Sequence, residues 1–487
     1  MTNSIKTTTI TNTFWKFAER FLAQGVSLIV SIVIARILIP EDYSVVSLVT
    51  IFFTFSNVII SGGLNTALIQ KKNADNEDYS TILFISVFLS VLIYLILFFC
   101  APWISNLFHQ PSLILIIRIM GLTLPVNAIK SIWCAYISSS LKFKKFFFAT
   151  LGGTLVSAVI GIVMAIKGYG PWALVAQQMS NTVIDTIILV LITRIGIVPR
   201  INKNKFKELF SYGWKILVSS LIATIYTELV PLIIGIRYEK DDLSFYTKGK
   251  SFPTTISSTV TYTLSAVIFP VIAKQQDNKE IVLEYTRKFM RIASFIMLPI
   301  MLGFFSIADN FIYVVLTEKW LSASYFIKLF CIVSIADIIA VGNCETIKAI
   351  GKSGTYLIME IIKKSCYFIT IILFTIFSNN PQILAISALV CSLVSLVVNA
   401  IPNKKIIGYK YRDQFLDLLP NIILSLLMVG SVYLVKLIFK VQFGLVLLIV
   451  EILAGAIVYF GLAFLSKNKT FFYLLNSLKG FLKKDEK

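Results

Sequence analysis

The sequence predicts an all-α membrane protein that crosses the bilayer many times. Hydrophobic residues make up 57% of its 487 residues and charged residues only 14%, and the mean hydropathy is +0.83. Such values are typical of polytopic membrane proteins and exclude a soluble globular domain. The apolar residues also form separate runs of roughly 20 residues, the length that a helix needs to cross a bilayer.

We expect about fourteen membrane-spanning helices. They are predicted near residues 14–38, 44–64, 80–102, 113–139, 147–167, 170–193, 212–236, 252–272, 288–306, 323–349, 354–377, 381–401, 416–438 and 442–465. Two of these runs are the least regular. The fourth contains Arg118 and Lys130, and the eighth is rich in serine and threonine.

A weak internal repeat predicts two halves. ARILIPEDYSVVS (35–47) and GIRYEKDDLSFYT (235–247) both place an arginine at a helix end, followed by an acidic turn and a serine. Repeats with a binding site at their interface are common in secondary transporters. We therefore expect two pseudo-symmetric six-helix bundles, two additional helices and a basic tail, with bounds at 1–200, 201–412, 413–466 and 467–487.

The basic residues predict the orientation in the membrane. The net charge is +20, and lysine and arginine gather in alternate loops, whereas the intervening loops ISNLFHQPS and SNNPQ contain none. Basic loops stay on the cytoplasmic side, so both termini are expected in the cytoplasm. Because the charge lies in short loops between apolar spans, nucleic acid is not expected as a partner.

The residues that most enzymes need are missing. The six cysteines lie in or beside apolar runs without C-x-x-C spacing, which predicts neither a disulfide framework nor a zinc site. His109 is the only histidine, and GKSGTY (351–356) lacks the upstream glycine of a P-loop. The polar connections, about 15 residues at most, cannot hold a catalytic domain. We therefore expect no enzyme, catalytic residue, metal or cofactor.

Ionisable residues inside the spans are the main functional candidates. A charge in hydrocarbon is costly unless it is paired, reaches the headgroups or faces a watery cavity. Arg20 and Gln24 lie one helical turn apart and share a face. Arg20, Arg118 and Lys130 outnumber the nearby acids, which predicts a cavity of positive potential suited to a phosphate or pyrophosphate group.

Acids within the spans are candidates for coupling transport to H⁺ or Na⁺. These are Asp185, Glu228, Asp337 and Glu345. Some charges in the spans can also be accommodated without any role in transport. Lys16, Lys215 and Lys288 can extend to the headgroups, and Glu360 can pair with Lys364 one turn away.

Several segments resemble bacterial polysaccharide exporters. The most specific are GGLNTALIQKKNADNEDYST (62–81) and GYGPWALVAQQ (168–178). The resemblance extends to about residue 400 through SLKFKKF (140–146), SYGWKIL (211–217), LIIGIRY (232–238) and LTEKWLSAS (316–324). The chain is similar to the polysaccharide transporter branch, the Wzx-like flippases, of the multidrug/oligosaccharidyl-lipid/polysaccharide (MOP) exporter superfamily.

The resemblance implies two bundles in a V around a central cavity, in the bacterial cytoplasmic (inner) membrane. It also implies translocation of undecaprenyl-pyrophosphate-linked oligosaccharide for lipopolysaccharide O-antigen, capsule or exopolysaccharide. Polysaccharide polymerase and glycosyltransferases are the implied partners, besides the substrate and membrane lipids. Similar flippases hold the pyrophosphate with cavity arginines, which makes Arg20 and Arg36 the first candidates by position. Together with the other cations in the two halves, the expected ligands are Arg20, Arg36, Arg118, Lys130, Arg237 and Lys364, with Gln24 as a polar cavity residue.

Two other functions stay open at this point. A cation-coupled multidrug exporter of the same superfamily would require a cavity rich in acids and aromatic residues. A membrane polysaccharide polymerase or glycosyltransferase usually has a large outer loop with catalytic acids or arginines, whereas the outer loops here span about 15 residues or fewer.

Overall fold

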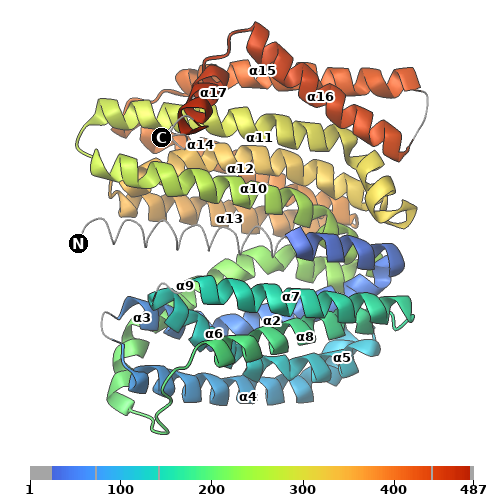
Figure 1. Cartoon of the computed structure of the whole chain (residues 1–487), viewed down its shortest axis with the longest axis vertical. Helices are drawn as coiled ribbons and strands as arrows, with labels where there is room; N and C mark the ends of the chain where they lie inside the picture. Colours follow the sequence, from blue (N-terminus) through green and yellow to red (C-terminus); the bar gives the residue numbers. More distant parts are fainter. Residues whose placement is uncertain (1–24, 72–73, 141–142, 440–442, 483–487) are drawn as a thin grey trace. The chain divides into compact units, whose positions relative to one another are not determined.

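The computed structural model describes residues 25–71, 74–140, 143–439 and 443–482, and these residues form helices without any strand (Figure 1). The chain divides into two compact units, Met1–Ser244 and Phe245–Lys487. The first unit contains the helix Gly25–Ile37, α2 (Pro40–Ser61), α3 (Leu64–Gln70), α4 (Asn76–Leu107), α5 (Ser112–Gly121), α6 (Thr123–Ser139), α7 (Phe143–Ile166), α8 (Pro171–Ile192), α9 (Lys203–Arg237) and the beginning of α10 (Lys240–Lys274).

The second unit contains the rest of α10 and the helices that follow it. These are α11 (Lys279–Leu316), the short 3₁₀ helix η1 (Glu318–Trp320), α12 (Ala323–Ala349), α13 (Ser353–Phe377), α14 (Pro381–Ile406), α15 (Tyr411–Phe439), α16 (Leu445–Leu465) and α17 (Lys469–Leu482).

The all-α polytopic prediction is confirmed. Every predicted span coincides with a helix, except that α5 and α6 share the fourth and only Gly25–Ile37 of the first is described. By length and composition, eleven segments of the described chain are apolar enough to cross a membrane. Two helices were not predicted: α3, which follows Gly62-Gly63, and α17, which lies in the segment expected to be a basic tail. The predicted boundary between the bundles at residue 200 stays a prediction.

The first unit is closely packed where α9 passes the break between α2 and α3. A Cβ atom added to Gly63 would lie 2.1 Å from the carbonyl oxygen of Gly213 on α9. Any side chain at this position would push the helices apart, so glycine here sets their separation. Nearby, the indole N–H of Trp133 on α6 donates to the carbonyl oxygen of Thr193 at 2.8 Å and fixes the end of α8.

Ion pairs connect the beginning of α9 to the beginning of α4. The Lys71 ammonium lies 3.0 Å from Asp78 and 2.9 Å from Glu208 on α9, and the Lys205 ammonium lies 2.5 Å from Asp75. Asp75 also caps α4 by accepting the backbone N–H of Asp78 at 2.9 Å. The hydrogen bond from Lys205, aided by this cap, lowers the pKa of Asp75 to about 2, so the cluster stays ionised at physiological pH.

The two turns of the predicted repeat have the same local geometry. The backbone N–H of Ile39 donates to the carboxylate of Asp42 at 3.3 Å, and that of Glu239 donates to Asp242 at 3.1 Å. An acid at the same place therefore caps α2 and α10 alike. The offset of 200 residues between these pairs supports the repeat at the level of backbone structure.

These two turns also contact each other, in what we call the turn–turn clasp (Glu41, Ser44, Lys240 and Ser244). The buried hydroxyl of Ser44 donates to the carbonyl oxygen of Lys240 and accepts the backbone N–H of Ser244 at 3.2 Å. The Lys240 ammonium lies 2.9 Å from Glu41. Lys71 follows α3, beyond the opposite end of α2. In the orientation predicted from the basic loops, which stays a prediction, the clasp would lie on the outer side of the membrane.

In the second unit, α15 and α16 pack along α11 (Figure 1). Glu451 on α16 is 0% exposed and accepts the amide N–H of Asn310 on α11 at 2.9 Å. The Lys436 ammonium on α15 lies 3.7 Å from the other oxygen of Glu451. The one acid of this apolar helix therefore has partners on α11 and on α15.

Candidate functional site

A small polar pocket lies within the first unit between α2, the α5–α6 segment and α8, and has a volume of about 130 Å³. Two apolar side chains, Phe53 and Met120, contribute to its wall. The other lining side chains carry a hydroxyl or an amide, and none is charged: Thr50, Thr54, Asn57, Thr123, Asn127, Gln178 and Thr182.

The amides give this pocket its binding chemistry. Thr50 and Thr54 donate their hydroxyls back to carbonyl oxygens of their own helix. Within the described residues, the side chains of Asn57, Asn127 and Gln178 have no hydrogen-bond partner. An amide offers both donors and acceptors, so these groups suit water or the hydroxyls of a neutral sugar.

An ion pair lies one helical turn beyond the pocket. The Lys130 ammonium on α6 is 2.6 Å from a carboxylate oxygen of Asp185 on α8, and the side chains are 25% and 3% exposed. Lys130 follows Asn127 by three residues, and Asp185 follows Thr182 by three, so both helices present the pair beside the pocket wall. Within the part of the chain that the structure describes, it brings the predicted site residues Lys130 and Asp185 together.

This pairing changes what either residue can contribute. Asp185 balances the charge of Lys130, so the pair adds no net positive potential for an anion. The second carboxylate oxygen of Asp185 is buried and, within the described chain, accepts no hydrogen bond. A buried acceptor without a partner is costly, and it leaves Asp185 able to accept a proton or a ligand donor. The binding and coupling roles of the two residues stay predictions.

Arg118 is held against a neighbouring helix. Its guanidinium lies 4.4 Å from the ring centre of Phe98 on α4, and its Nε donates to the carbonyl oxygen of Phe98 at 3.4 Å. The contact explains how a cation is tolerated in an apolar helix, because the ring face and the carbonyl replace lost hydration. The remaining guanidinium N–H groups can still bind an anion.

The other predicted cations lie on different helices. Arg36 lies at the end of the first described helix and Arg237 is the last residue of α9, and both are exposed. Lys364 on α13 is half-buried. Arg20 and Gln24 lie outside the described residues. The expected pyrophosphate site therefore stays a prediction.

The predicted coupling acids on the second unit differ in environment. Glu345 pairs with Lys348 at 3.0 Å, whereas Asp337 is exposed midway along α12. In the first unit, Glu228 is half-buried on α9. The pairing considered for Glu360 is corrected: it lies 2.5 Å from Lys363, not Lys364, because the side chain reaches the i+3 position.

Two charged groups of structural importance were not predicted. Glu451 interrupts the apolar run LVLLIVEILAG, and this interruption was a usable signal. Asp417 accepts hydrogen bonds from Arg287 and Arg291 of α11, at 2.7 and 2.9 Å from the Nε atom of each. Nothing in the sequence indicates that these residues, about 130 positions apart, would meet.

The described residues form a polytopic helical bundle in which eleven helices are long and apolar enough to cross a membrane. A family model described as "Polysaccharide biosynthesis protein" matches residues 33–325, which is more than half of the chain. The chain belongs to this family.

Two curated relatives extend the similarity. An "Uncharacterized membrane protein in cps region" of Klebsiella pneumoniae is 26% identical over 98% of both chains. The "Succinoglycan biosynthesis transport protein ExoT" of Rhizobium meliloti (strain 1021) is 22% identical over 66% of this chain and 65% of its own length. One relative is thus named as a transport protein of polysaccharide synthesis.

Solved structures share the fold. The lipid II flippase MurJ in an inward closed conformation has a TM-score of 0.74 at 15% identity, covering 94% of this chain and 99% of its own. An inward-facing multidrug transporter of the MATE family, from the MOP superfamily, has a TM-score of 0.62 at 13% identity, covering 78% and 94%. Both similarities establish a MOP-type fold.

We predict that Lys130→Ala destabilises the protein, because it leaves the buried carboxylate of Asp185 without a cation. The loss should reach about 3–5 kcal/mol, and the double variant K130M/D185L should recover most of it. The thermal midpoint of the purified protein measures both effects. Lys167→Met, at an exposed lysine beyond α7, serves as the control. Equal midpoints for K130A and wild type would contradict the structural role of the pair.

Proposed function

We propose that this protein is a flippase that moves undecaprenyl-pyrophosphate-linked oligosaccharides across the bacterial cytoplasmic membrane for surface polysaccharide synthesis. The observation that carries the proposal is membership of the polysaccharide biosynthesis family over residues 33–325, in a chain with eleven described helices long and apolar enough to cross a membrane. Movement of a membrane-bound intermediate is the step of polysaccharide synthesis that such a protein fits.

The neutral polar pocket of the first unit supports a carbohydrate cargo. Its threonine hydroxyls and amides match the hydroxyl groups of sugars, and its lining contains one aromatic residue and no acid. A cavity for cationic drugs would instead present acids and aromatic faces. The multidrug alternative therefore has only the shared fold in its favour.

We propose that the diphosphate of the cargo binds to cationic side chains outside the polar pocket. Arg118 keeps unused N–H groups beside Phe98, whereas Lys130 is already paired with Asp185. Arg20, Arg36, Arg237 and Lys364 remain proposed ligands of the diphosphate. We also propose that both termini lie in the cytoplasm and that H⁺ or Na⁺ is the coupling ion. Polymerase and glycosyltransferases are the proposed partners in the same pathway.

Alternating access requires that contacts on one side of the membrane open while those on the other side close. The turn–turn clasp joins the first turns of α2 and α10 on the side that we assign as external. We propose that it closes the outer entrance and must separate when the cargo is released.

Genetic complementation tests the function directly. In a strain that lacks its own copy of the gene, the wild-type chain should restore surface polysaccharide, whereas R20A/R118A at equal abundance should not, because both proposed diphosphate ligands lose their charge. Surface polysaccharide and the lipid-linked precursor retained in the membrane are both measured. Full surface display by R20A/R118A would contradict the assigned binding residues. If the wild-type chain does not restore surface polysaccharide but raises the strain's resistance to cationic drugs, the multidrug alternative would be favoured.

Cross-linking tests the clasp. In a cysteine-free background, S44C/S244C joined by a disulfide or a short bifunctional thiol reagent should reduce export at least about tenfold, because the outer entrance can no longer open. Reductant should restore export. The single variants S44C and S244C, treated identically, are the controls. Unchanged export by the fully cross-linked protein would show that the clasp does not move during transport.

A further inference from the structure

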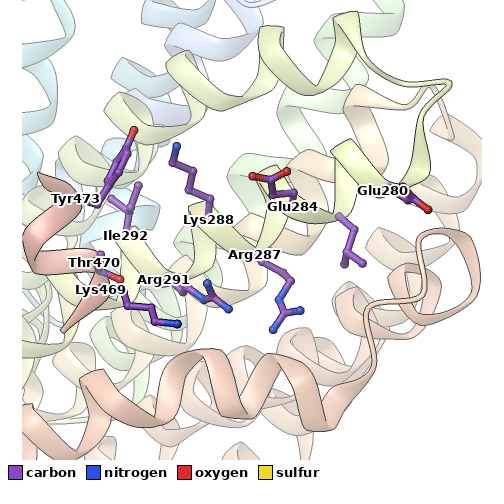
Figure 2. A pocket seen from close by; sticks show the side chains of 10 residues that line it. Glu280, Glu284, Arg287, Lys288, Arg291, Ile292, Lys469, Thr470 and Tyr473 are labelled. Atoms are coloured by element: carbon purple, nitrogen blue, oxygen red, sulfur yellow. The ribbon is translucent and has the colours of Figure 1, made fainter. Parts of the chain in front are cut away.

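A larger pocket, of about 460 Å³, lies in the second unit between the first turns of α11 and the helix α17 (Figure 2). It is distant in sequence from every residue proposed above to bind the cargo. Four cations line it, together with two acids and four uncharged residues: Arg287, Lys288, Arg291 and Lys469; Glu280 and Glu284; Leu283, Ile292, Thr470 and Tyr473. Its volume is that of a site for a small ligand.

Two arginines are held in position by a carboxylate behind them. Arg287 donates through Nε and Nη2 to Asp417 at 2.7 and 2.9 Å, and Arg291 donates through the same two atoms at 2.9 and 2.5 Å. The buried Tyr409 hydroxyl also donates to Asp417, at 2.8 Å. A guanidinium has five N–H groups, so three remain on each arginine for another acceptor. One carboxylate balances only one of the two positive charges.

The helix α17 closes one side of the pocket and is fixed there by several contacts. Asn468 caps α17 and donates its amide N–H to Asn421 on α15 at 3.2 Å. The Lys288 ammonium lies 4.1 Å from the ring centre of Tyr473 on α17. Phe471 packs on Phe295 of α11, with ring centres 6.2 Å apart. The pocket is thus a built site rather than a chance gap.

The pocket lies at the depth of the lipid headgroups. Only Ser466–Asn468 separates the last membrane-spanning helix, α16, from α17, so α17 must remain at the membrane surface. The charged turns of α11 change to an apolar helix at Ile292, which itself lines the pocket. The surrounding loops are rich in lysine and arginine, which places this end on the cytoplasmic side.

We propose that this pocket binds the phosphate of an anionic phospholipid of the cytoplasmic leaflet. Arginine matches phosphate oxygens with paired hydrogen bonds, and Lys469 adds a point charge at the rim. The apolar Leu283 and Ile292 provide surface for the glycerol and the first acyl carbons. Including Asp417, the charges sum to a small excess of positive charge, which favours a singly charged phosphodiester over a free, doubly charged phosphate.

Lipid binding to the purified full-length protein in neutral detergent tests this inference. The probes are phosphatidylglycerol, phosphatidylcholine and inorganic phosphate, titrated separately and in competition. Phosphatidylglycerol should bind at least about tenfold more tightly than phosphatidylcholine, because the pocket has an excess of positive charge and only phosphatidylglycerol has a net negative charge. Lys469→Gln should weaken phosphatidylglycerol binding about fivefold, the effect of one basic residue at an anionic surface.

A variant that should strengthen lipid binding keeps the test decisive if a variant that weakens binding folds poorly. Glu284→Gln removes an exposed acid from the pocket and should strengthen phosphatidylglycerol binding severalfold. Lys405→Gln, at an exposed lysine near the end of α14 that does not line the pocket, should leave binding unchanged. Wild-type affinity in both K469Q and E284Q would overturn the site, and displacement of phosphatidylglycerol by inorganic phosphate at equal concentration would overturn the lipid assignment.

Discussion

The cost of placing charge in a membrane is the constraint on which this structure depends. Within each unit, the described charges inside the helices are mostly paired or capped. Lys130 meets Asp185, Asn310 and Lys436 meet Glu451, and Asp417 joins two arginines of α11. The contacts of Lys130 with Asp185, of Asn310 with Glu451 and of Asp417 with the two arginines connect helices that are not consecutive in sequence, whereas Lys436 and Glu451 connect the neighbouring α15 and α16. These pairs therefore specify which helices lie together, a task that apolar packing alone performs poorly in lipid.

This constraint separates structural from functional charges. Cations that look available in the sequence are partly committed once the fold is known, as Lys130 illustrates. What remains is a neutral pocket of hydroxyls and amides in the first unit, together with arginines that keep unused donors, such as Arg118. A carbohydrate with a charged diphosphate requires this combination, because its sugars need hydrogen bonds without net charge and its diphosphate needs cations.

Hydropathy alone was sufficient to predict the spans, because length and apolarity decide which segments enter the bilayer. It missed α17, which is too short to span a bilayer, and α3, which depends on a glycine break. The repeat at 35–47 and 235–247 was visible from its acids, and the same capping geometry recurs in both turns. Partners such as Asp417 with Arg287 could not be predicted, since pairing depends on how helices face each other in space. The roles of Arg20 and Gln24 stay predictions, since both lie outside the described residues.

The most direct test of the proposed transport is an assay of the purified chain alone. The protein is reconstituted in proteoliposomes that carry undecaprenyl-pyrophosphate-linked oligosaccharide in one leaflet, and the sugar that reaches the other leaflet is measured with a membrane-impermeant oxidant or lectin. A flippase should expose the sugar at a rate that rises with the amount of protein, whereas empty liposomes should not. Exposure no faster than in empty liposomes, from a folded protein, would contradict the assignment.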